Sequence, residues 1–270
     1  MSRHLPPYFD GLLAAYRAGQ AGRDVHLGLW DDPPPSDVAA RDGFGVAQRR
    51  LTDRLIDAAD IRDGQDVLDV ACGLGGTLDV LNARATSLRL TGVNIDRRQL
   101  AICRTITPRS ANSLALVAAD ADALPCRTAS VDRVLCVEAM FHFASRSGFL
   151  EEAARVLRPD GVLAVTDILL QPPPFGAPWD ADTIAAVIRR DYGPWPDPWI
   201  GTDDLHREGE RAGFDVVASK DWTTATLPSY AAIFPDPAPE RRRTPDAGAV
   251  FRWMHTQRWL TYRMVVYRRR

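Results

Sequence analysis

The sequence lacks the features that would place the chain in a membrane or direct it out of the cell. No run of about 18 apolar residues occurs among its 270 residues, so no segment is expected to span a membrane. The N-terminal residues include Pro6 and Pro7 and have no apolar core typical of a signal peptide. We therefore expect a cytoplasmic protein without a membrane partner.

Cysteine and net charge are also scarce. The four cysteines, Cys72, Cys103, Cys126 and Cys136, form no CxxC pair, which favours reduced structural thiols over a disulfide framework. The formal net charge is only −2, and no basic stripe is evident, so we expect no nucleic-acid partner. No matching cluster of Asp, Asn and His is evident either, and we expect no metal.

Apolar residues, in contrast, are plentiful. They make up 46% of the chain, which is enough for the core of one large α/β domain. We interpret residues 1–270 as a single domain in four parts. These are a helical N-terminal cap (1–50), a cofactor-binding core (51–170), a lid and substrate region that completes the sheet (171–258) and a C-terminal strand (259–270).

Short apolar runs alternate with helical segments through the middle of the chain, with helices expected at 97–106, 149–161 and 203–213. This alternation predicts an α/β fold with a Rossmann-like, doubly wound sheet of seven strands. No helix follows the last strand, so we expect that strand to be antiparallel. The expected strands are 66–71, 87–95, 113–119, 130–139, 162–170, 214–223 and 260–269.

Two regions interrupt this alternation. Residues 1–50 contain two prospective helices around the three prolines at 33–35. Residues 171–200 form a long insertion rich in proline and tryptophan, and loops of this length are usually functional. We expect an aromatic lid over a moderately apolar substrate, although tryptophans that pack onto the core would give the same composition. The lid candidates are Trp179, Tyr192, Trp195, Trp199, Trp222, Tyr230 and Phe234.

The turn after the first expected strand is the clearest candidate for ligand binding. It reads DVACGLGGT (69–77), and doubly wound sheets bind their ligands beside this turn. Its glycines let a ligand approach the backbone closely. Leu78 stands where a dinucleotide fingerprint has its third glycine, and the acid Asp69 suits an ammonium-bearing ligand better than a diphosphate. A tight turn without a ligand is the structural alternative.

Polar residues follow the next two strands. Asn94, assisted by Gln99 or Asp96, can reach ribose hydroxyls, although Asp96 can equally cap the helix that follows it. The carboxylate of Asp120 and the backbone N–H of Ala121 form the natural pair for the edge of an adenine. A surface turn is the alternative for this last pair.

With these segments in their order and spacing, the chain resembles the class I S-adenosylmethionine-dependent methyltransferases. The resemblance is to the branch that holds natural-product O- and C-methyltransferases, sterol and tocopherol methyltransferases and cyclopropane fatty-acid synthases. HLGLWDD (26–32) resembles a segment that precedes the core in this branch. The matching core segments are VLDVACGLGGT (67–77), TGVNIDRRQLAIC (91–103), AADADALP (118–125), SVDRVLCVEAMFHF (130–143) and RVLRPDGVLAVTD (155–167).

The resemblance implies S-adenosylmethionine as cofactor, S-adenosylhomocysteine as product, and a role for each matching residue. One departure is Asn94, where much of the wider family has an acid. The implied contacts are Asp69, Ala71, Cys72, Gly73 and Gly75 along the turn that holds the methionine part; Asn94, Ile95 and Gln99 for ribose and adenine; Asp120 and Ala121 for the adenine edge; and Cys136, Val137 and His142 beside the sulfonium.

Methyl transfer is an in-line displacement on an activated sulfonium, so the enzyme contributes mainly positioning and proton removal. His142, after the fourth strand, is the candidate general base for a hydroxyl or amine proton, although a structural histidine is the alternative. Asp167, at the end of the fifth strand, is the second catalytic candidate. It can orient His142, bind a polar group of the substrate, or cap a turn. Glu138 is expected to be scaffolding at the sheet end, though it can face the pocket.

We therefore expect methyl transfer to a small organic acceptor of secondary metabolism, by O- or N-methylation, with C-methylation as a further option. Three alternatives stay open. They are a cyclase or rearrangement enzyme that only retains the cofactor, a nicotinamide-dependent oxidoreductase, which Leu78 and Asp120 argue against, and a non-catalytic binding module. The sequence leaves monomer and homodimer equally open.

Overall fold

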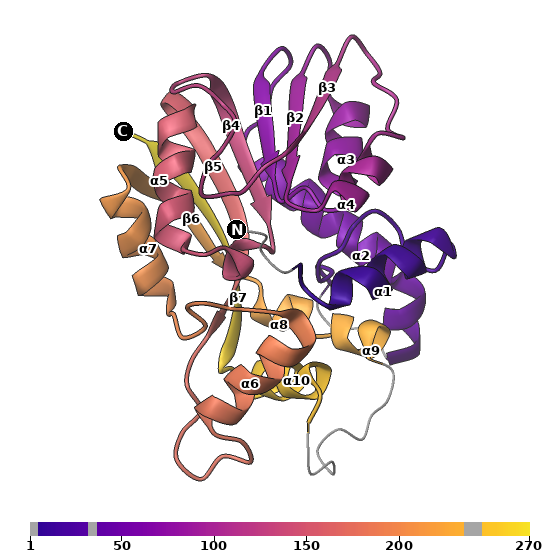
Figure 1. Ribbon diagram of the computed structural model, residues 1–270, viewed down its shortest axis with the longest axis vertical. Coiled ribbons are helices and arrows are strands. Elements are labelled where there is room, and N and C mark those ends of the chain that lie inside the picture. The colour runs from indigo at the N-terminus through magenta and orange to yellow at the C-terminus, as the bar shows by residue number, and fades with distance from the viewer. Residues whose placement is uncertain (1–4, 32–36, 235–244) are drawn as a thin grey trace.

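The computed structural model describes residues 5–31, 37–234 and 245–270. Its centre is a seven-stranded sheet of order β3-β2-β1-β4-β5-β7-β6 (Figure 1). Only β7 runs antiparallel to its neighbours, so the predicted Rossmann-like sheet with an antiparallel last strand is confirmed. The strands are β1 (Asp66–Val70), β2 (Arg89–Asn94), β3 (Ser113–Ala118), β4 (Val131–Val137), β5 (Leu157–Leu170), β6 (Phe214–Asp221) and β7 (Leu260–Arg269).

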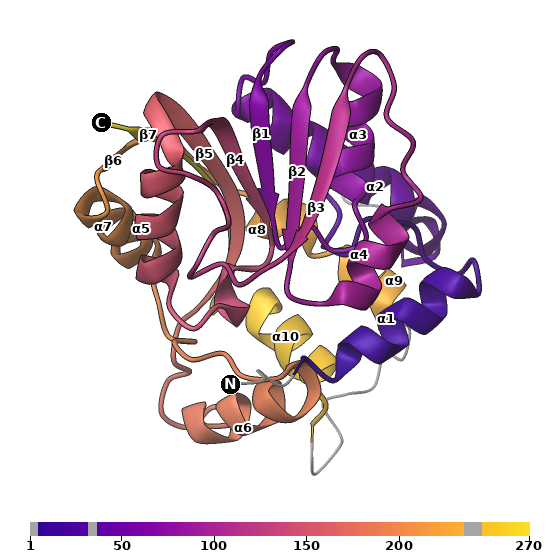
Figure 2. The same cartoon turned by 45° about the horizontal axis from the view of Figure 1, so that its top comes forward.

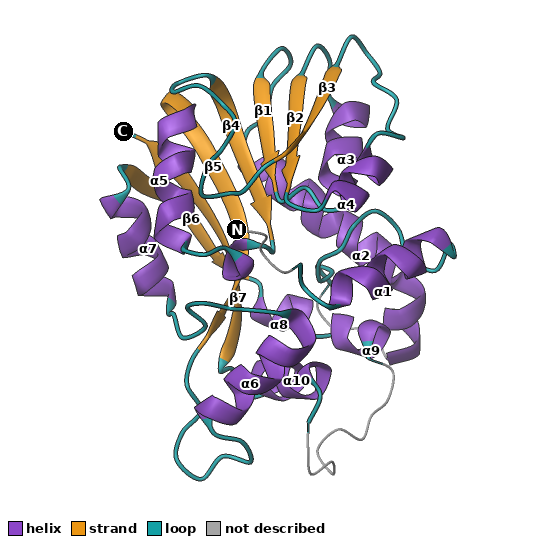
Figure 3. Cartoon of the chain, viewed as in Figure 1, coloured by secondary structure: helices purple, strands orange, loops and turns teal. Residues whose placement is uncertain are grey.

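Helices cover both faces of the sheet and also its lower end (Figures 1 and 3). The strands β1 to β3 end at that lower end, and α1, α6, α9 and α10 lie beyond it in both views (Figure 2). The helices are α1 (Tyr8–Arg17), α2 (Asp37–Ala58), α3 (Gly76–Arg84), α4 (Arg97–Cys103), the 3-10 helix η1 (Met140–His142), α5 (Arg146–Val156), α6 (Ala181–Tyr192), α7 (Thr202–Arg211), α8 (Thr223–Thr226), α9 (Ser229–Ile233) and α10 (Ala247–Thr256).

The N-terminal part contains the two expected helices, α1 and α2. Helix α2 continues past residue 50, so the expected boundary there does not coincide with a break in the helix, and the division into four parts stays a prediction. The prolines at 33–35 lie outside the described residues. None of the helices in the described part of the chain has both the length and the apolar character needed to span a bilayer.

The ends of several elements differ from the sequence prediction. The helix expected at 149–161 begins at Arg146, where the Ser145 hydroxyl accepts from the N–H of Gly148, and it ends at Val156. Strand β5 then begins at Leu157, which pairs with Val131. Residues 157–161, which were expected to end the helix, therefore belong to β5, where the pairing with β4 is irregular.

Two predicted helix ends were close to the observed ones. Asp96 caps α4 by accepting from the N–H of Arg98, as one of the two alternatives predicted. Helix α7, expected to begin at residue 203, begins at Thr202, and the carboxylate of Asp204 accepts from the N–H of Gly201 just before it. Gly213, with φ +96°, follows this helix, and positive φ is the conformation that glycine supplies at helix ends.

The aromatic residues of the insertion form a second apolar core beyond the end of the sheet. Trp195 is buried between Phe141 and Phe251, with ring centroids 4.2 and 5.4 Å away. Tyr230 is buried in the same cluster. The structure thus favours the packing alternative for these tryptophans and tyrosines. Helix α10 contributes Phe251 to this cluster.

Candidate active site

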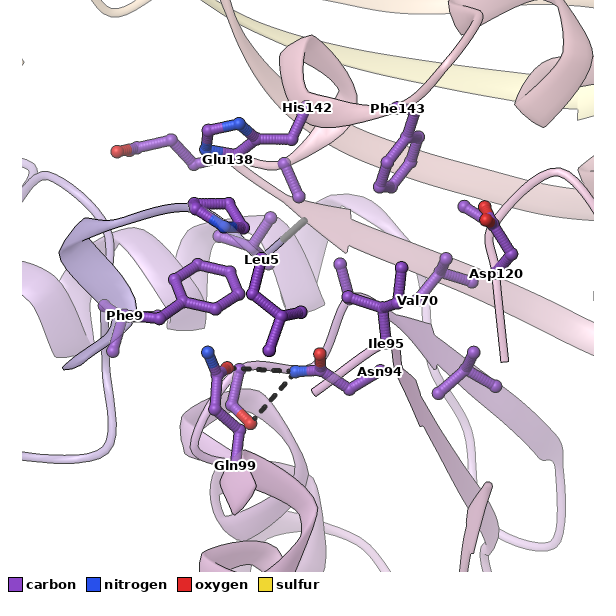
Figure 4. Close-up of a pocket in the computed structure, with 18 of the residues that line it drawn as sticks. Leu5, Phe9, Val70, Asn94, Ile95, Gln99, Asp120, Glu138, His142 and Phe143 are labelled. Atoms are coloured by element: carbon purple, nitrogen blue, oxygen red, sulfur yellow. Dashed lines mark hydrogen bonds between the residues drawn. The ribbon is translucent and has the colours of Figure 1, made fainter. Parts of the chain in front are cut away.

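A cavity of about 340 Å³ lies where the carboxyl ends of β1, β2, β3 and β4 meet (Figure 4). Doubly wound sheets bind their ligands at this crevice, and the volume suits a cofactor-sized molecule. Most of the residues predicted to contact a cofactor line this cavity. They are Ala71, Gly73, Asn94, Ile95, Gln99, Asp120, Ala121, Val137 and His142.

The glycine-rich turn forms one wall of the cavity. Ala71 and Gly73 both have positive φ, +58° and +54°, which turns the backbone sharply after β1. A Cβ atom on Gly73 would come within 2.9 Å of Val25, so a side chain there would collide with the segment that covers the turn. Gly75 does not line the cavity. It is the N-cap of α3, where a Cβ atom would meet Ile106 at 2.8 Å, so it shapes the turn from behind.

A pair of buried amides marks the next part of the wall. Asn94 donates to the Gln99 Oε1 atom over 3.0 Å and accepts from the N–H of Asp96 over 2.9 Å (Figure 4). The Nε2 atom of Gln99 is buried without a hydrogen-bond partner. Since buried polar atoms are normally satisfied, this donor beside the cavity fits a ligand acceptor such as a ribose hydroxyl.

The far end of the cavity combines an apolar platform with an acid. Ile95 is a large apolar side chain and is 42% exposed at the cavity, as expected for a surface on which an adenine stacks. Asp120 and Ala121 line the cavity after β3, and the Asp120 carboxylate accepts from the N–H of Asp122 over 3.3 Å. This combination fits the edge and the face of an adenine.

Some of the predicted contacts lie behind the wall and not on it. Asp69 is 1% exposed, its Oδ2 atom has no hydrogen-bond partner, and burial raises its pKa to about 8. Cys136 is fully buried in the main core, and burial raises the pKa of its thiol. Cys72 packs under the turn, where a Cβ atom on Gly92 would lie 3.1 Å from its sulfur. Asp69, Cys72, Gly75 and Cys136 do not line the cavity, and their contact with a cofactor stays a prediction.

His142 lies on η1 at the opposite wall. Burial lowers the pKa of its imidazole to about 3, so the ring is neutral at physiological pH. The Nε2 atom lies 3.1 Å from the Tyr8 hydroxyl, and the two rings stack with centroids 5.7 Å apart. The Nδ1 atom is buried and has no hydrogen bond of normal geometry to the described residues, although the backbone of Pro194 lies close enough to the ring to favour its protonated form. The side chain is thus held in place by α1 on one side and by the Pro194 segment on the other.

Asp167 does not orient His142. Its Oδ2 atom accepts from the Arg146 Nε atom over 2.7 Å, in an ion pair whose side chains are 3% and 1% exposed. Arg146 also donates to the Asp197 carbonyl over 2.6 Å. Because its carboxylate is paired with Arg146 in the core, Asp167 is not the expected partner of His142. Asp167 also does not line the cavity.

Sequence reasoning missed the wall contributed by α1. Leu5, Pro6, Tyr8, Phe9 and Leu12 line the cavity, and Figure 4 shows Leu5 and Phe9 facing Gln99 and Asn94. Tyr8, Phe9 and Leu12 lie on α1, where their spacing marks an apolar face, and Leu5 and Pro6 precede that helix. The spacing could not show which surface this face covers.

The segment that resembles the family's HxGxWD element forms a strap, residues 23–31, between the turn and the helices. Arg23 donates to the Leu74 carbonyl over 2.9 Å. The N–H of Leu27 donates to Glu138 and that of Gly28 to Ser229, both over 2.9 Å. The strap covers the glycine-rich turn and is fixed to both sides of the cavity.

These residues fit S-adenosylmethionine. The glycine-rich turn at Gly73 leaves room for the methionine part, Gln99 and Asn94 offer amides to the ribose, and Ile95 and Asp120 offer a face and an edge to the adenine. The segments that follow β1, β2 and β3 thus supply the groups that the three parts of this cofactor require.

Comparisons with known proteins agree with this reading. The profile of a family described as "Methyltransferase domain" matches residues 68–165. Methyltransferase GfsG of Streptomyces halstedii is 31% identical over 243 residues, which cover 87% of this chain and 81% of the relative. The 27-O-demethylrifamycin SV methyltransferase of Amycolatopsis mediterranei is 32% identical over 211 residues, which cover 77% of this chain and 73% of the relative.

Solved structures share the fold at lower identity. The mycolic acid cyclopropane synthase CmaA1, solved with S-adenosylhomocysteine, superposes with a TM-score of 0.73 at 16% identity, covering 98% of this chain and 99% of that one. The [4+2]-cyclase SpnF superposes with a TM-score of 0.69 at 20% identity, covering 97% and 93%. Together with the sequence relatives and the cavity, this establishes that the chain belongs to the class I S-adenosylmethionine-dependent methyltransferases, in the branch that includes natural-product methyltransferases.

Proposed function

We propose that this methyltransferase methylates a hydroxyl oxygen of a small, mainly apolar natural product, with His142 as the proton acceptor. The observation that carries the proposal is the position of His142, a neutral imidazole on the wall of the cofactor cavity. When bound, the cofactor supplies an activated methyl group, which leaves positioning and proton removal to the protein.

The surroundings of His142 indicate the character of the acceptor. Phe143, Pro194 and Pro196 line the cavity on this side and present apolar surface. Glu138 and Tyr8 are the polar neighbours that also line it. A cavity with a few polar groups in an apolar wall binds moderately apolar organic molecules and orients them by hydrogen bonds.

The contacts of His142 also define how it could take a proton. In the tautomer with its proton on Nε2, the imidazole donates to the Tyr8 hydroxyl and keeps the Nδ1 lone pair as an acceptor. In the other tautomer Tyr8 donates to Nε2, and an acceptor hydroxyl would have to displace it. Burial opposes the charged imidazolium, so proton transfer is favoured only when an acceptor oxygen becomes bonded to the methyl group at the same time.

The relatives support oxygen as the atom methylated. The 27-O-demethylrifamycin SV methyltransferase and the O-methyltransferase rstn1 of Aspergillus nomiae, which is 30% identical over 199 residues, carry that activity in their names. For this chain, O-methylation is the proposal, and transfer to nitrogen or carbon is what a product analysis would distinguish from it.

The test is a product screen followed by substitution of His142. Purified protein with S-adenosylmethionine and a panel of phenolic, enolic and amine natural products is analysed by mass spectrometry. A product heavier by one methyl group supports transfer, whereas an unchanged mass in a converted substrate supports the cyclase alternative. His142→Gln should lower turnover at least about tenfold while S-adenosylhomocysteine affinity holds, and unchanged turnover removes His142 as the base.

The proposal also places the enzyme in the cytoplasm, without a nucleic-acid partner, as a monomer or homodimer. All four cysteines are free thiols in the structure, which suits a reducing compartment. Size-exclusion chromatography with light scattering decides between monomer and dimer.

A further inference from the structure

Glu138 lines the cofactor cavity beside His142, but the proton transfer proposed above does not use it. It follows β4 directly and has φ +50°, a conformation that is uncommon for residues other than glycine. Its N–H donates to the backbone carbonyl of Thr166 over 2.9 Å and approaches the Thr166 hydroxyl at 3.0 Å. Strained backbone of this kind persists where neighbours fix it, and it concentrates at ligand sites.

The side chain of Glu138 is also fixed from outside the cavity. The Oε2 atom accepts from the N–H of Leu27 in the strap over 2.9 Å. Tyr262, whose hydroxyl donates to Thr166 over 3.1 Å, lies on the other side. Figure 4 shows Glu138 next to His142, across the cavity from Gln99. The carboxyl group therefore has a defined place on the wall that faces the amides of the adenosyl end.

Within the described part of the chain one buried cation faces Glu138, and the other titratable groups around it are acids, phenols and the neutral imidazole of His142. His26 in the strap is the cation. Burial alone would lower its pKa, but the Asp24 carboxylate 3.5 Å away raises it above the usual value. The other described titratable groups around Glu138 are His142 on η1, Asp167 on β5, Tyr262 on β7, Tyr8 on α1, Tyr192 on α6 and Tyr230 on α9.

Burial raises the pKa of Glu138 to about 7, although His26 and the Leu27 N–H oppose that rise. At neutral pH the carboxyl is therefore close to the midpoint of its titration. A positive charge in a buried site favours the ionised form of a nearby carboxyl, by an amount that typically shifts the pKa by one unit or more.

The cofactor and its product differ in one charge at the reacting atom. S-adenosylmethionine has a positive sulfonium, S-adenosylhomocysteine has a neutral thioether, and both have the same ammonium and carboxylate groups. Strands β1 and β4 are neighbours, with Asp69 opposite Leu135, so the turn at Ala71 and the wall at Val137 and Glu138 lie side by side. Because β4 lies on the opposite side of β1 from β2 and β3, the part of a ligand held at the turn lies next to this wall, and its adenosyl end extends away from it.

We propose that Glu138 is the group by which the cavity distinguishes the charged cofactor from the neutral product. It releases a proton to the solvent when the sulfonium binds and stays protonated when the thioether binds. The tighter binding of the charged form would limit inhibition by the product. The inference depends on the cofactor and not on the acceptor or on His142. If it fails, the O-methylation proposal is unaffected, and if the O-methylation proposal fails, the role of Glu138 is unaffected.

Isothermal titration calorimetry tests the proposal without an acceptor. The wild-type protein is titrated near pH 7, in two buffers of different ionisation enthalpy, with S-adenosylmethionine, with S-adenosylhomocysteine, and with sinefungin, which has an amine cation in place of the sulfonium. We expect roughly half a proton more to be released with either cation than with S-adenosylhomocysteine. The affinity for the cations should fall as the pH is lowered below about 7, because protonation of Glu138 then opposes binding, whereas the affinity for S-adenosylhomocysteine should not follow it.

Glu138→Gln should abolish the difference in proton release and weaken binding of the cations about tenfold, with S-adenosylhomocysteine affinity unchanged. Asp69→Asn is the matched control, because Asp69 is also a buried acid with a raised pKa but lies behind the wall. Its removal should affect all three ligands alike. Equal loss for all ligands in Glu138→Gln overturns the proposal. The proposal is also overturned if the wild-type protein releases as many protons with S-adenosylhomocysteine as with the cations. This second measurement does not depend on whether the variant folds.

Discussion

The buried ion pair between Arg146 and Asp167 gives the most demanding test of the structure. Arg146 donates to the Asp167 carboxylate and to the carbonyls of Asp197 and Ile168, over 2.7, 2.6 and 3.3 Å. It thus ties the start of α5 to the end of β5 and to the segment that contributes Pro196 to the cavity. Arg146→Met keeps the apolar stem of the side chain and removes all three bonds.

The expected loss is large because both charges are buried. Removing one partner of a buried, hydrogen-bonded ion pair typically costs about 3–5 kcal/mol. Burial already raises the pKa of Asp167, while Arg146 lowers it. Without Arg146 this pKa should rise further above its unfolded value. Folding then takes up a proton, so the deficit of the variant should shrink as the pH falls from about 7 to about 5.

Urea unfolding at both pH values measures this effect. Arg146→Met should lose about 3–5 kcal/mol at neutral pH and recover part of it at the lower pH. The double variant Arg146→Met with Asp167→Asn should be less pH-dependent, because no carboxylate is left to bury. A loss below about 1 kcal/mol, which is the size of a surface ion pair, or a deficit that does not change with pH, would refute the reasoning.

Three further predictions concern the cavity and the strap. Gln99→Leu should weaken S-adenosylhomocysteine about tenfold in calorimetry, because it removes an amide donor that has no partner among the described residues. It should also lower the free energy of unfolding by about 1–3 kcal/mol, because the buried amide of Asn94 loses the Oε1 acceptor; unchanged affinity would show that Gln99 makes no contact with the ligand. Gly73→Ala should cost roughly 1 kcal/mol or more in urea unfolding, since φ is +54° and Val25 is 2.9 Å from the added Cβ, and a neutral effect would contradict the tight turn. The pKa of His26 is raised above 6.5 in the folded protein. The stability from its pairing with Asp24 should therefore be present below pH 6.5 and lost as the pH rises through the folded pKa. His26→Asn should remove this pH dependence of the free energy of unfolding, and an equal pH dependence in both proteins would argue against the pairing.

The cofactor half of the site was predictable because its residues are local to strand ends. In a parallel sheet the carboxyl ends of neighbouring strands meet at one edge. Residues that directly follow β1, β2 and β3 therefore had to converge, and Gly73, Asn94 and Asp120 do so. The alternation of strands and helices predicted the doubly wound sheet, and the lack of a helix after the last strand predicted that β7 is antiparallel, whereas the order of the strands comes from the structure.

The remaining half depended on contacts that sequence spacing does not encode. Asp167 was predicted beside His142 because both follow central strands, but the partner that takes its carboxylate, Arg146, begins a helix 21 residues earlier. Cys136 is adjacent to Val137 in the chain, yet alternation along β4 turns its thiol into the core while Val137 reaches the cavity. Because successive side chains of a strand point to opposite faces, a prediction that is wrong by one residue names a core residue in place of one that lines the cavity.

The position of α1 has a consequence for how specificity can change in this fold. The cofactor end is built from strand ends whose positions the sheet fixes, so substitutions there affect every acceptor alike. The wall near His142 is built from Tyr8 on α1 and from Pro194 and Pro196 after α6, which come from outside the parallel core. Tyr8 also holds the Nε2 atom of His142. A substitution in α1 therefore alters the shape of the acceptor end and the proton acceptor together, and Tyr8→Phe should shift the pH dependence of turnover while leaving S-adenosylhomocysteine affinity within about threefold. If affinity and turnover fell in proportion, Tyr8 would be part of the cofactor wall alone.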